Sequence, residues 1–309
     1  MMKKVLILAA AVAVGCAVVA SGQKASRLDA ATVANEKVEK VVPISEIPNV
    51  EGPRLFVVGD STLSAFNDNY FYPRYGYGTR LPDYLDASKI TVFNLAMSGR
   101  SSKSFLTEKN YATLVDNIRE GDYIIIGFGH NDEKCEEKRY TNPNGSKETE
   151  GSFKNVLYEK YVKLAKDRNA TPILCTPIVR RSPNGTYSGS TVHITADSDG
   201  FKGGNYAQAI IELGKETGTL VVDLTKITKE RYEGLSSAAT AKFHAQKMKE
   251  ADTIDNTHLN YYGAAVVAYD VVAAVKAEDS VFASFVRDDI KMPTEKILKK
   301  NKKYARPPK

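Results

Sequence analysis

Tryptophan is absent from the 309-residue sequence, and cysteine and histidine are scarce, with three and four residues respectively. Three cysteines exclude the disulfide framework of small secreted domains, and four histidines leave a short list of candidates for a general base. Without tryptophan, an aromatic surface that stacks on a ligand must consist of tyrosine or phenylalanine. Cys175 lies in an apolar run, which favours a buried free thiol, and a disulfide between Cys135 and Cys175 is the alternative.

The N-terminus carries a hydrophobic run that is too short to be a membrane-spanning helix. It covers residues 5–19, whereas a spanning helix needs roughly 20 residues. Lysines precede this run and small residues follow it, which is the pattern of a cleaved secretory signal. We predict a signal peptide over residues 1–22 and a location that is secreted, periplasmic or at the cell surface. Residues 13–16 also resemble a bacterial lipoprotein box, so lipidation of Cys16 would be the one link to a membrane.

The net charge of +6 does not indicate a nucleic-acid partner, because it is concentrated at the C-terminus. Residues 291–309 hold eight lysines and arginines against one glutamate, which leaves a small negative charge on the rest of the chain. Such a basic tail is typically solvated. Residues 23–50 are polar and lack aromatics, as a spacer would. We therefore predict one domain over residues 51–285, followed by a basic tail over 286–309.

Five short apolar runs that no charge interrupts predict the strands of a sheet buried on both faces. Helical spacing of apolar residues lies between them and after the last of them. The runs cover residues 55–58, 91–93, 123–126, 172–175 and 220–222, and the helical patterns include 153–165, 207–214 and 262–277. Strands that alternate with helices indicate an α/β fold, a three-layer α/β/α sandwich with a five-stranded parallel sheet.

Polar and glycine-containing turns follow the first three predicted strands. In open parallel sheets the reactive groups gather beyond the carboxyl ends of the strands. The first strand ends at residues 59–61, the second leads to Gly99, and the third ends at 129–132. A further polar segment, residues 255–258, is expected to open the last helix.

These turns hold the residue types that hydrolyse an ester, which needs a nucleophile, a base, a group that orients the base, and oxyanion donors. Ser61 follows a strand at what we expect to be a strand-to-helix turn, although a helix N-cap is the alternative. Asp255 precedes His258 by three residues and could hold its imidazole, or it could cap a helix. Asn131 and Gly99 could donate to an oxyanion, although glycine is also common in turns.

A metal site built from residues 130–132 with Asp255 and His258 is the competing interpretation. No close-spaced pair of ligands on a helix supports it. The residues therefore disfavour a metal at this edge of the sheet.

Four blocks of the sequence resemble the conserved blocks of the SGNH (GDSL-type) hydrolase family. They are residues 59–64, 94–101, 129–132 and 255–258, and residues 176–181 are similar to its rhamnogalacturonan acetylesterase branch. The resemblance covers roughly residues 54–275. It implies a flavodoxin-like arrangement of the sheet.

The resemblance also implies a role for each matching residue. Ser61 would be the nucleophile, His258 the base and Asp255 the residue that orients it. The backbone N–H groups of Ser61 and Gly99 and the side-chain amide of Asn131 would form the oxyanion hole. Asp60 would be a buried scaffold residue. The resemblance implies no metal and no organic cofactor.

Three arginines are expected near the same edge, namely Arg100, Arg180 and Arg181. An arginine pairs well with the carboxylate of a uronate sugar, although ordinary surface charge is the alternative. The loop over residues 182–204 is long for this family and could cover the site.

We therefore predict a monomeric serine esterase that removes acetyl groups from an acetylated plant cell-wall polysaccharide of the pectin type. Alternatives are an acetyl esterase for xylan or another polymer, a lipase or thioesterase on the same fold, and a polysaccharide-binding module without activity.

Overall fold

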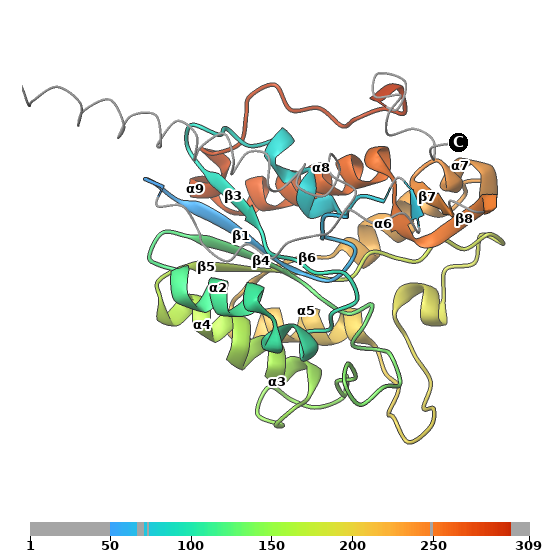
Figure 1. Cartoon of the computed structure of the whole chain (residues 1–309), viewed down its shortest axis with the longest axis horizontal. Coiled ribbons are helices and arrows are strands. Elements are labelled where there is room, and N and C mark those ends of the chain that lie inside the picture. Colours follow the sequence, from blue (N-terminus) through green and yellow to red (C-terminus); the bar gives the residue numbers. More distant parts are fainter. Residues whose placement is uncertain (1–49, 67–70, 73, 248–249, 298–309) are drawn as a thin grey trace, which may run out of the picture.

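A computed structural model describes residues 50–66, 71–72, 74–247 and 250–297 (Figure 1). The predicted signal peptide, Cys16, nearly all of the spacer and the end of the basic tail lie outside these residues. Within the described ranges, no helix has both the length and the apolar character that crossing a bilayer requires.

Five parallel strands form the central sheet, in the order β3-β1-β4-β5-β6. They are β1 (Arg54–Gly59), β3 (Thr91–Asn94), β4 (Tyr123–Gly127), β5 (Thr171–Cys175) and β6 (Leu220–Val222). In β1, Val57 pairs with Asn94 on one side and Ile125 on the other. The predicted five-stranded parallel sheet is confirmed, and its strand order is the flavodoxin-like one.

Alternate residues of β1 enter two separate cores, because successive side chains of a strand point to opposite faces. Leu55 and Val57 pack toward one face, and Phe56 and Val58 toward the other. Figure 1 shows the helices of the two outer layers on either side of the sheet. The side of Phe56 is covered by α2 (Lys109–Asn117), α3 (Phe153–Leu157), a π-helical turn (Tyr158–Val162), α4 (Lys163–Asp167) and α5 (Tyr206–Thr217).

The side of Leu55 is covered mainly by the long helix α8 (Tyr261–Glu278). Small and β-branched residues let it lie flat on the sheet. It begins at Asn260, whose side-chain oxygen accepts a hydrogen bond from the Gly263 N–H at 2.9 Å. The helices beside it are α6 (Leu224–Tyr232), α7 (Ser237–Ala241) and α9 (Ser280–Ala283). Short 3-10 turns lie at Tyr77–Thr79, Leu81–Asp83, Ser104–Thr107 and Gly189–Val192.

A second sheet holds the segment that we expected to open the last helix. Residues 255–258 belong to β8 (Glu250–Leu259), which pairs antiparallel with β7 (His244–Lys247), and β7 pairs with β2 (Phe71–Tyr72). The prediction of a helix start at Asp255 is therefore wrong. The helix begins only after its cap at Asn260, because residues 250–259 form β8, which pairs with β7 at Glu250, Ile254 and Leu259.

The two cysteines of the domain do not form the disulfide that was one alternative. Cys135 is exposed and Cys175 is buried, and both are free. Burial raises the pKa of the Cys175 thiol to about 12, so this side chain acts as a small core residue.

Candidate active site

Ser61 lies in a tight turn at the carboxyl end of β1. The turn is fixed by Asp60, whose Oδ1 accepts hydrogen bonds from the backbone N–H and the hydroxyl of Thr62, both at 2.8 Å. Burial raises the pKa of Asp60 although these bonds oppose the rise. No helix starts at Ser61, so it is not an N-cap; further turns follow it. The scaffold role expected for Asp60 agrees with these contacts.

Asp255 and His258 form a close pair at the end of β8. The Asp255 Oδ2 lies 2.7 Å from the His258 Nδ1, and its Oδ1 accepts the N–H groups of Thr257 and His258 at 2.8 and 3.0 Å. Burial alone would raise the pKa of Asp255, but the hydrogen bonds from His258 and the backbone outweigh it and lower the pKa to about 2. The carboxylate is thus ionised at neutral pH and orients the imidazole.

The strand that carries His258 lies beside the turn that carries Ser61. Residues 75–76 connect them, because the Tyr75 N–H donates to the Leu259 carbonyl at 2.9 Å and the Gly76 N–H donates to the Ser64 carbonyl at 3.0 Å. A side chain at Gly76 would not fit, since an added Cβ would lie 2.2 Å from the Leu63 carbonyl carbon.

The side chains of the two segments also meet. The Phe66 ring contacts the His258 ring edge-on, with 5.7 Å between ring centroids. Within the described residues, no hydrogen bond joins the Ser61 hydroxyl to His258.

The second and third turns reach the same edge of the sheet. The Met97 N–H donates to the Gly59 carbonyl at 3.0 Å, and the Asn94 side chain donates to the Leu63 carbonyl at 2.8 Å. Gly99 has a φ of +79°, which strongly favours glycine. These contacts place the loop of Gly99 against the Ser61 turn.

The third turn, residues 129–132, is held in place by the buried carboxylate of Asp132. Asp132 accepts hydrogen bonds from the N–H and hydroxyl of Ser102 and from the Thr141 hydroxyl. Burial raises the pKa of Asp132 to about 7, against these bonds. Asn131 precedes it and is 7% exposed. A metal at this turn would have to compete with the donors that already occupy the Asp132 carboxylate.

The four histidines differ in what their rings contact. His130 is buried, and burial keeps its pKa well below the usual value, so it is neutral. Burial also lowers the pKa of His244 to about 4, and its Nε2 lies 3.1 Å from the Tyr232 hydroxyl. His193 has no exposed surface. His258 alone combines a carboxylate partner with a partly exposed ring.

Arg181 is largely buried and donates hydrogen bonds within the protein. It is 7% exposed, and its guanidinium donates to the Asn256 side chain at 2.8 Å and to Ser237 and Thr240. Its backbone N–H also donates to the Asn256 carbonyl at 2.8 Å. Arg181 therefore holds the segment next to Asp255, and its predicted role in substrate binding stays a prediction.

The other two arginines are partly exposed. Arg100 follows Gly99, pairs with Glu108 at 2.8 Å and has 37% of its side chain exposed. Arg180 is 18% exposed and pairs with Glu133. Of the three predicted arginines, Arg100 has the most open position beside the candidate oxyanion residues.

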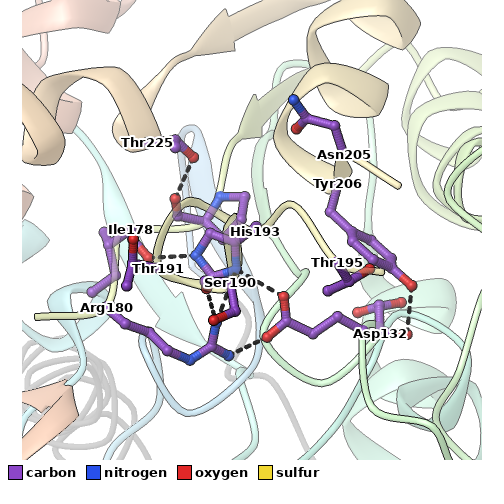
Figure 2. A network of polar contacts seen from close by, with 12 residues as sticks. Asp132, Ile178, Arg180, Ser190, Thr191, His193, Thr195, Asn205, Tyr206 and Thr225 are labelled. Atoms are coloured by element: carbon purple, nitrogen blue, oxygen red, sulfur yellow. Dashed lines mark hydrogen bonds and ion pairs between the residues drawn. The ribbon is translucent and has the colours of Figure 1, made fainter. Parts of the chain in front are cut away.

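A buried polar network missed by the sequence analysis attaches the long loop to the third turn (Figure 2). The His193 Nδ1 lies 3.1 Å from Glu133, and its Nε2 lies 2.7 Å from the Ile178 carbonyl. Arg180 pairs with the same glutamate and donates to the Ser190 carbonyl at 2.9 Å. The only sequence feature that pointed to Glu133 is its position directly after the third block. No local sequence pattern connects Glu133 with His193.

Residues 55–271 match the family model of GDSL-like lipases and acylhydrolases. The chain belongs to this family and is a carboxylic ester hydrolase. Two solved structures support the fold. The first is YxiM from Bacillus subtilis, which matches with a TM-score of 0.57 and 24% identity. The match covers 74% of this chain and 57% of YxiM. The second is a protein from Lactobacillus plantarum, which matches with a TM-score of 0.51 and 19% identity. The match covers 75% of this chain and 100% of that protein.

Within the family, the chain is similar to rhamnogalacturonan acetylesterases. It is 29% identical to the Bacillus subtilis enzyme RhgT over 72% of this chain and 89% of the relative. It is 26% identical to the rhamnogalacturonan acetylesterase of Emericella nidulans over 75% of this chain and 88% of the relative. The resemblance inferred from the four blocks is thereby confirmed.

Proposed function

We propose that this protein is a secreted serine esterase that removes O-acetyl groups from an acetylated pectin-type polysaccharide. The observation that carries the proposal is the 2.7 Å contact between the Asp255 carboxylate and His258, on a strand that lies beside the Ser61 turn. A carboxylate-held imidazole next to a serine at the carboxyl edge of a parallel sheet is the arrangement that acyl transfer needs.

The proposed reaction runs through an acetyl-enzyme. His258 takes the proton of the Ser61 hydroxyl as the oxygen attacks the acetyl carbonyl, and Asp255 stabilises the imidazolium that forms. The tetrahedral intermediate collapses, its C–O bond to the sugar breaks, and His258 returns the proton to the departing sugar oxygen. Water then attacks the acetyl-serine with His258 again as base. The bond between the acetyl carbon and the Ser61 oxygen breaks, His258 returns the proton to that oxygen, and acetate leaves.

The oxyanion would be stabilised by three donors at the same edge. These are the backbone N–H groups of Ser61 and Gly99 and the side-chain amide of Asn131. The first step also needs the Ser61 hydroxyl within hydrogen-bond distance of the His258 Nε2. Catalytic contacts of this kind are often long without substrate and shorten when it binds.

The substrate class is supported by the names of the relatives and by charge near the site. Arg100 is partly exposed next to Gly99, and a guanidinium suits the carboxylate of a galacturonate unit. Secretion is supported by the N-terminal sequence pattern. We propose a monomer that acts on the polymer outside the cytoplasm.

The triad is tested by replacing its nucleophile and its base. We expect Ser61→Ala and His258→Ala to abolish acetate release from p-nitrophenyl acetate and from acetylated rhamnogalacturonan, while circular dichroism shows that both variants are folded. Ser284→Ala, at the exposed serine that follows α9, is the matched control and should retain full activity. Near-normal turnover by either triad variant would rule out the mechanism.

The substrate is tested separately, with the wild-type enzyme. Acetate release should be fastest from acetylated rhamnogalacturonan and slower from acetylated xylan. Preference for xylan would contradict the pectin assignment, and preference for a medium-chain acyl ester would indicate a lipase-type enzyme.

A further inference from the structure

The side-chain oxygen of Asn131 accepts a hydrogen bond from Arg139. The Arg139 Nη1 lies 3.0 Å from the Asn131 Oδ1. A guanidinium can only donate hydrogen bonds, so the Asn131 atom that faces it must be the carbonyl oxygen. The NH₂ group of Asn131 therefore points away from Arg139.

We propose that Arg139 is a positioning residue of the oxyanion hole. By fixing the oxygen of Asn131, it turns the NH₂ group toward the place where negative charge develops. Its positive charge next to the oxygen also polarises the amide, which strengthens the N–H as a donor. This inference rests on the proposed function, because it assumes that Asn131 donates to the oxyanion.

Arg139 is itself held in place by a two-point ion pair. Its Nε and Nη2 donate to the two carboxylate oxygens of Glu136 at 3.0 and 2.6 Å. The Arg139 N–H also donates to the Glu136 carbonyl at 2.9 Å. All three guanidinium nitrogens thus contact the protein, and the side chain is 25% exposed.

The loop that carries Arg139 is closed at its base. The Thr141 N–H donates to the Asp132 carbonyl at 3.2 Å, and the Tyr206 hydroxyl donates to the carbonyls of both Asp132 and Thr141 at 3.1 and 2.9 Å. Residues 132 and 141 are therefore fixed to each other and to α5. Because both ends of this loop are fixed, the position of Arg139 beside Asn131 is restricted.

Direct binding of a substrate carboxylate by Arg139 is the competing role. It is disfavoured because Glu136 already occupies two of the guanidinium nitrogens and Asn131 the third. The two roles also differ kinetically, since loss of a substrate contact raises KM, whereas loss of a contact made only in the transition state lowers kcat.

The test is a double-mutant cycle on p-nitrophenyl acetate, a neutral substrate. Asn131→Ala should lower kcat roughly 10²–10³-fold, the usual effect of losing one oxyanion donor. Arg139→Met keeps the stem of the side chain and should lower kcat about tenfold with KM within about twofold. In the Asn131→Ala background, Arg139→Met should have no further effect, because the residue through which it acts is gone.

Two variants serve as controls. Lys138→Met removes the same charge from the neighbouring exposed residue and should leave kcat and KM within about twofold of the wild type. Arg139→Lys keeps a charge but offers a less rigid donor, and should lower kcat about threefold. If Arg139→Met does not fold, the same cycle is run with Arg139→Lys.

The inference would be overturned if Arg139→Met lowered kcat equally in the wild-type and Asn131→Ala backgrounds. It would also be overturned if Arg139→Met left the kcat of the wild-type background unchanged. An effect confined to KM would assign Arg139 to substrate binding. Failure of the proposed function looks different, because Ser61→Ala would then retain activity whatever Arg139 does.

Discussion

The Asp255 carboxylate accepts three hydrogen bonds, one from the His258 ring and two from backbone N–H groups. These donors stabilise its ionised form more than burial destabilises it, which explains its pKa of about 2. A carboxyl whose pKa is lowered on folding stabilises the folded state above its unfolded pKa. That contribution is lost as the pH falls toward the folded pKa.

The pH dependence gives a prediction at the residue scale. Asp255→Asn should lower the free energy of unfolding by about 2 kcal/mol at pH 5, the value of a shift from 3.8 to about 2. At pH 3 the difference between the two proteins should be clearly smaller, because part of the wild-type contribution is then lost.

Urea unfolding at the two pH values measures this difference. Asp116→Asn, at an exposed carboxylate, is the control and should change the unfolding free energy by less than about 0.5 kcal/mol at both. A difference for Asp255→Asn that is the same at pH 3 and pH 5 would contradict the prediction.

At the scale of elements, the loop over residues 182–204 depends on charges buried beneath it. Glu133 pairs with both Arg180 and His193. His193 adopts a left-handed conformation, with a φ of +62°. Such a conformation is uncommon for a residue other than glycine, and here both ring nitrogens have partners that hold it.

Removal of the Glu133 carboxylate is expected to loosen this loop. Glu133→Ala should lower the free energy of unfolding by about 3–5 kcal/mol, because the largely buried Arg180 guanidinium loses its carboxylate and the buried His193 ring loses a partner. Hydrogen exchange should rise in residues 182–204 before it rises in the strands.

Glu233→Ala removes an exposed acid that pairs with Lys229 and is the matched control. It should cost about 0.5 kcal/mol or less. Unchanged exchange of residues 182–204 in Glu133→Ala would show that the network does not hold the loop.

At the scale of the whole molecule, stability and catalysis use opposite edges of the central sheet. Ser61 follows the carboxyl end of β1, whereas Arg54 begins that strand. Arg54 forms an ion pair with Asp122, next to the start of β4, and the two side chains are 4% and 1% exposed. The Arg54 N–H also donates to Asp122 at 3.1 Å. This pair joins two neighbouring strands far from the candidate site.

Arg54→Met should therefore destabilise the fold without changing the chemistry. We expect a loss of about 3–5 kcal/mol in unfolding free energy, because a buried carboxylate loses its partner. The kcat of the folded protein should stay within about twofold of the wild type. Urea unfolding and active-site titration measure the two quantities.

Lys163→Met, which breaks an exposed pair with Asp167, is the control and should cost less than about 1 kcal/mol. A large fall in kcat for Arg54→Met would show that the two edges of the sheet are coupled.

Local patterns predicted the elements of this fold well where apolar residues are continuous. The run at residues 220–222 coincides with β6, and the pattern at 262–277 lies within α8. The antiparallel sheet was missed because β7 and β8 are polar and short of apolar residues. Their backbone pairing depends on partners that are distant in the sequence.

The candidate site was predictable as a set of residues but not as a set of contacts. Ser61, Gly99, Asn131, Asp255 and His258 all lie in the blocks that resemble the family. Arg181 lies in a similar stretch, yet its guanidinium turned inward to hold Asn256. Burial of a long charged side chain depends on acceptors supplied by other segments.

The sequence by itself determined the alternation of strands and helices, the strand ends at which polar turns gather, and the identity of the family. These follow from local periodicity and from short blocks of residues. Only the tertiary structure decided that Asp255 lies on a strand, that Glu133 meets His193, and that Arg139 faces Asn131. Those contacts join segments by hydrogen bonds whose partners are chosen by three-dimensional packing, and no local pattern of residues encodes them.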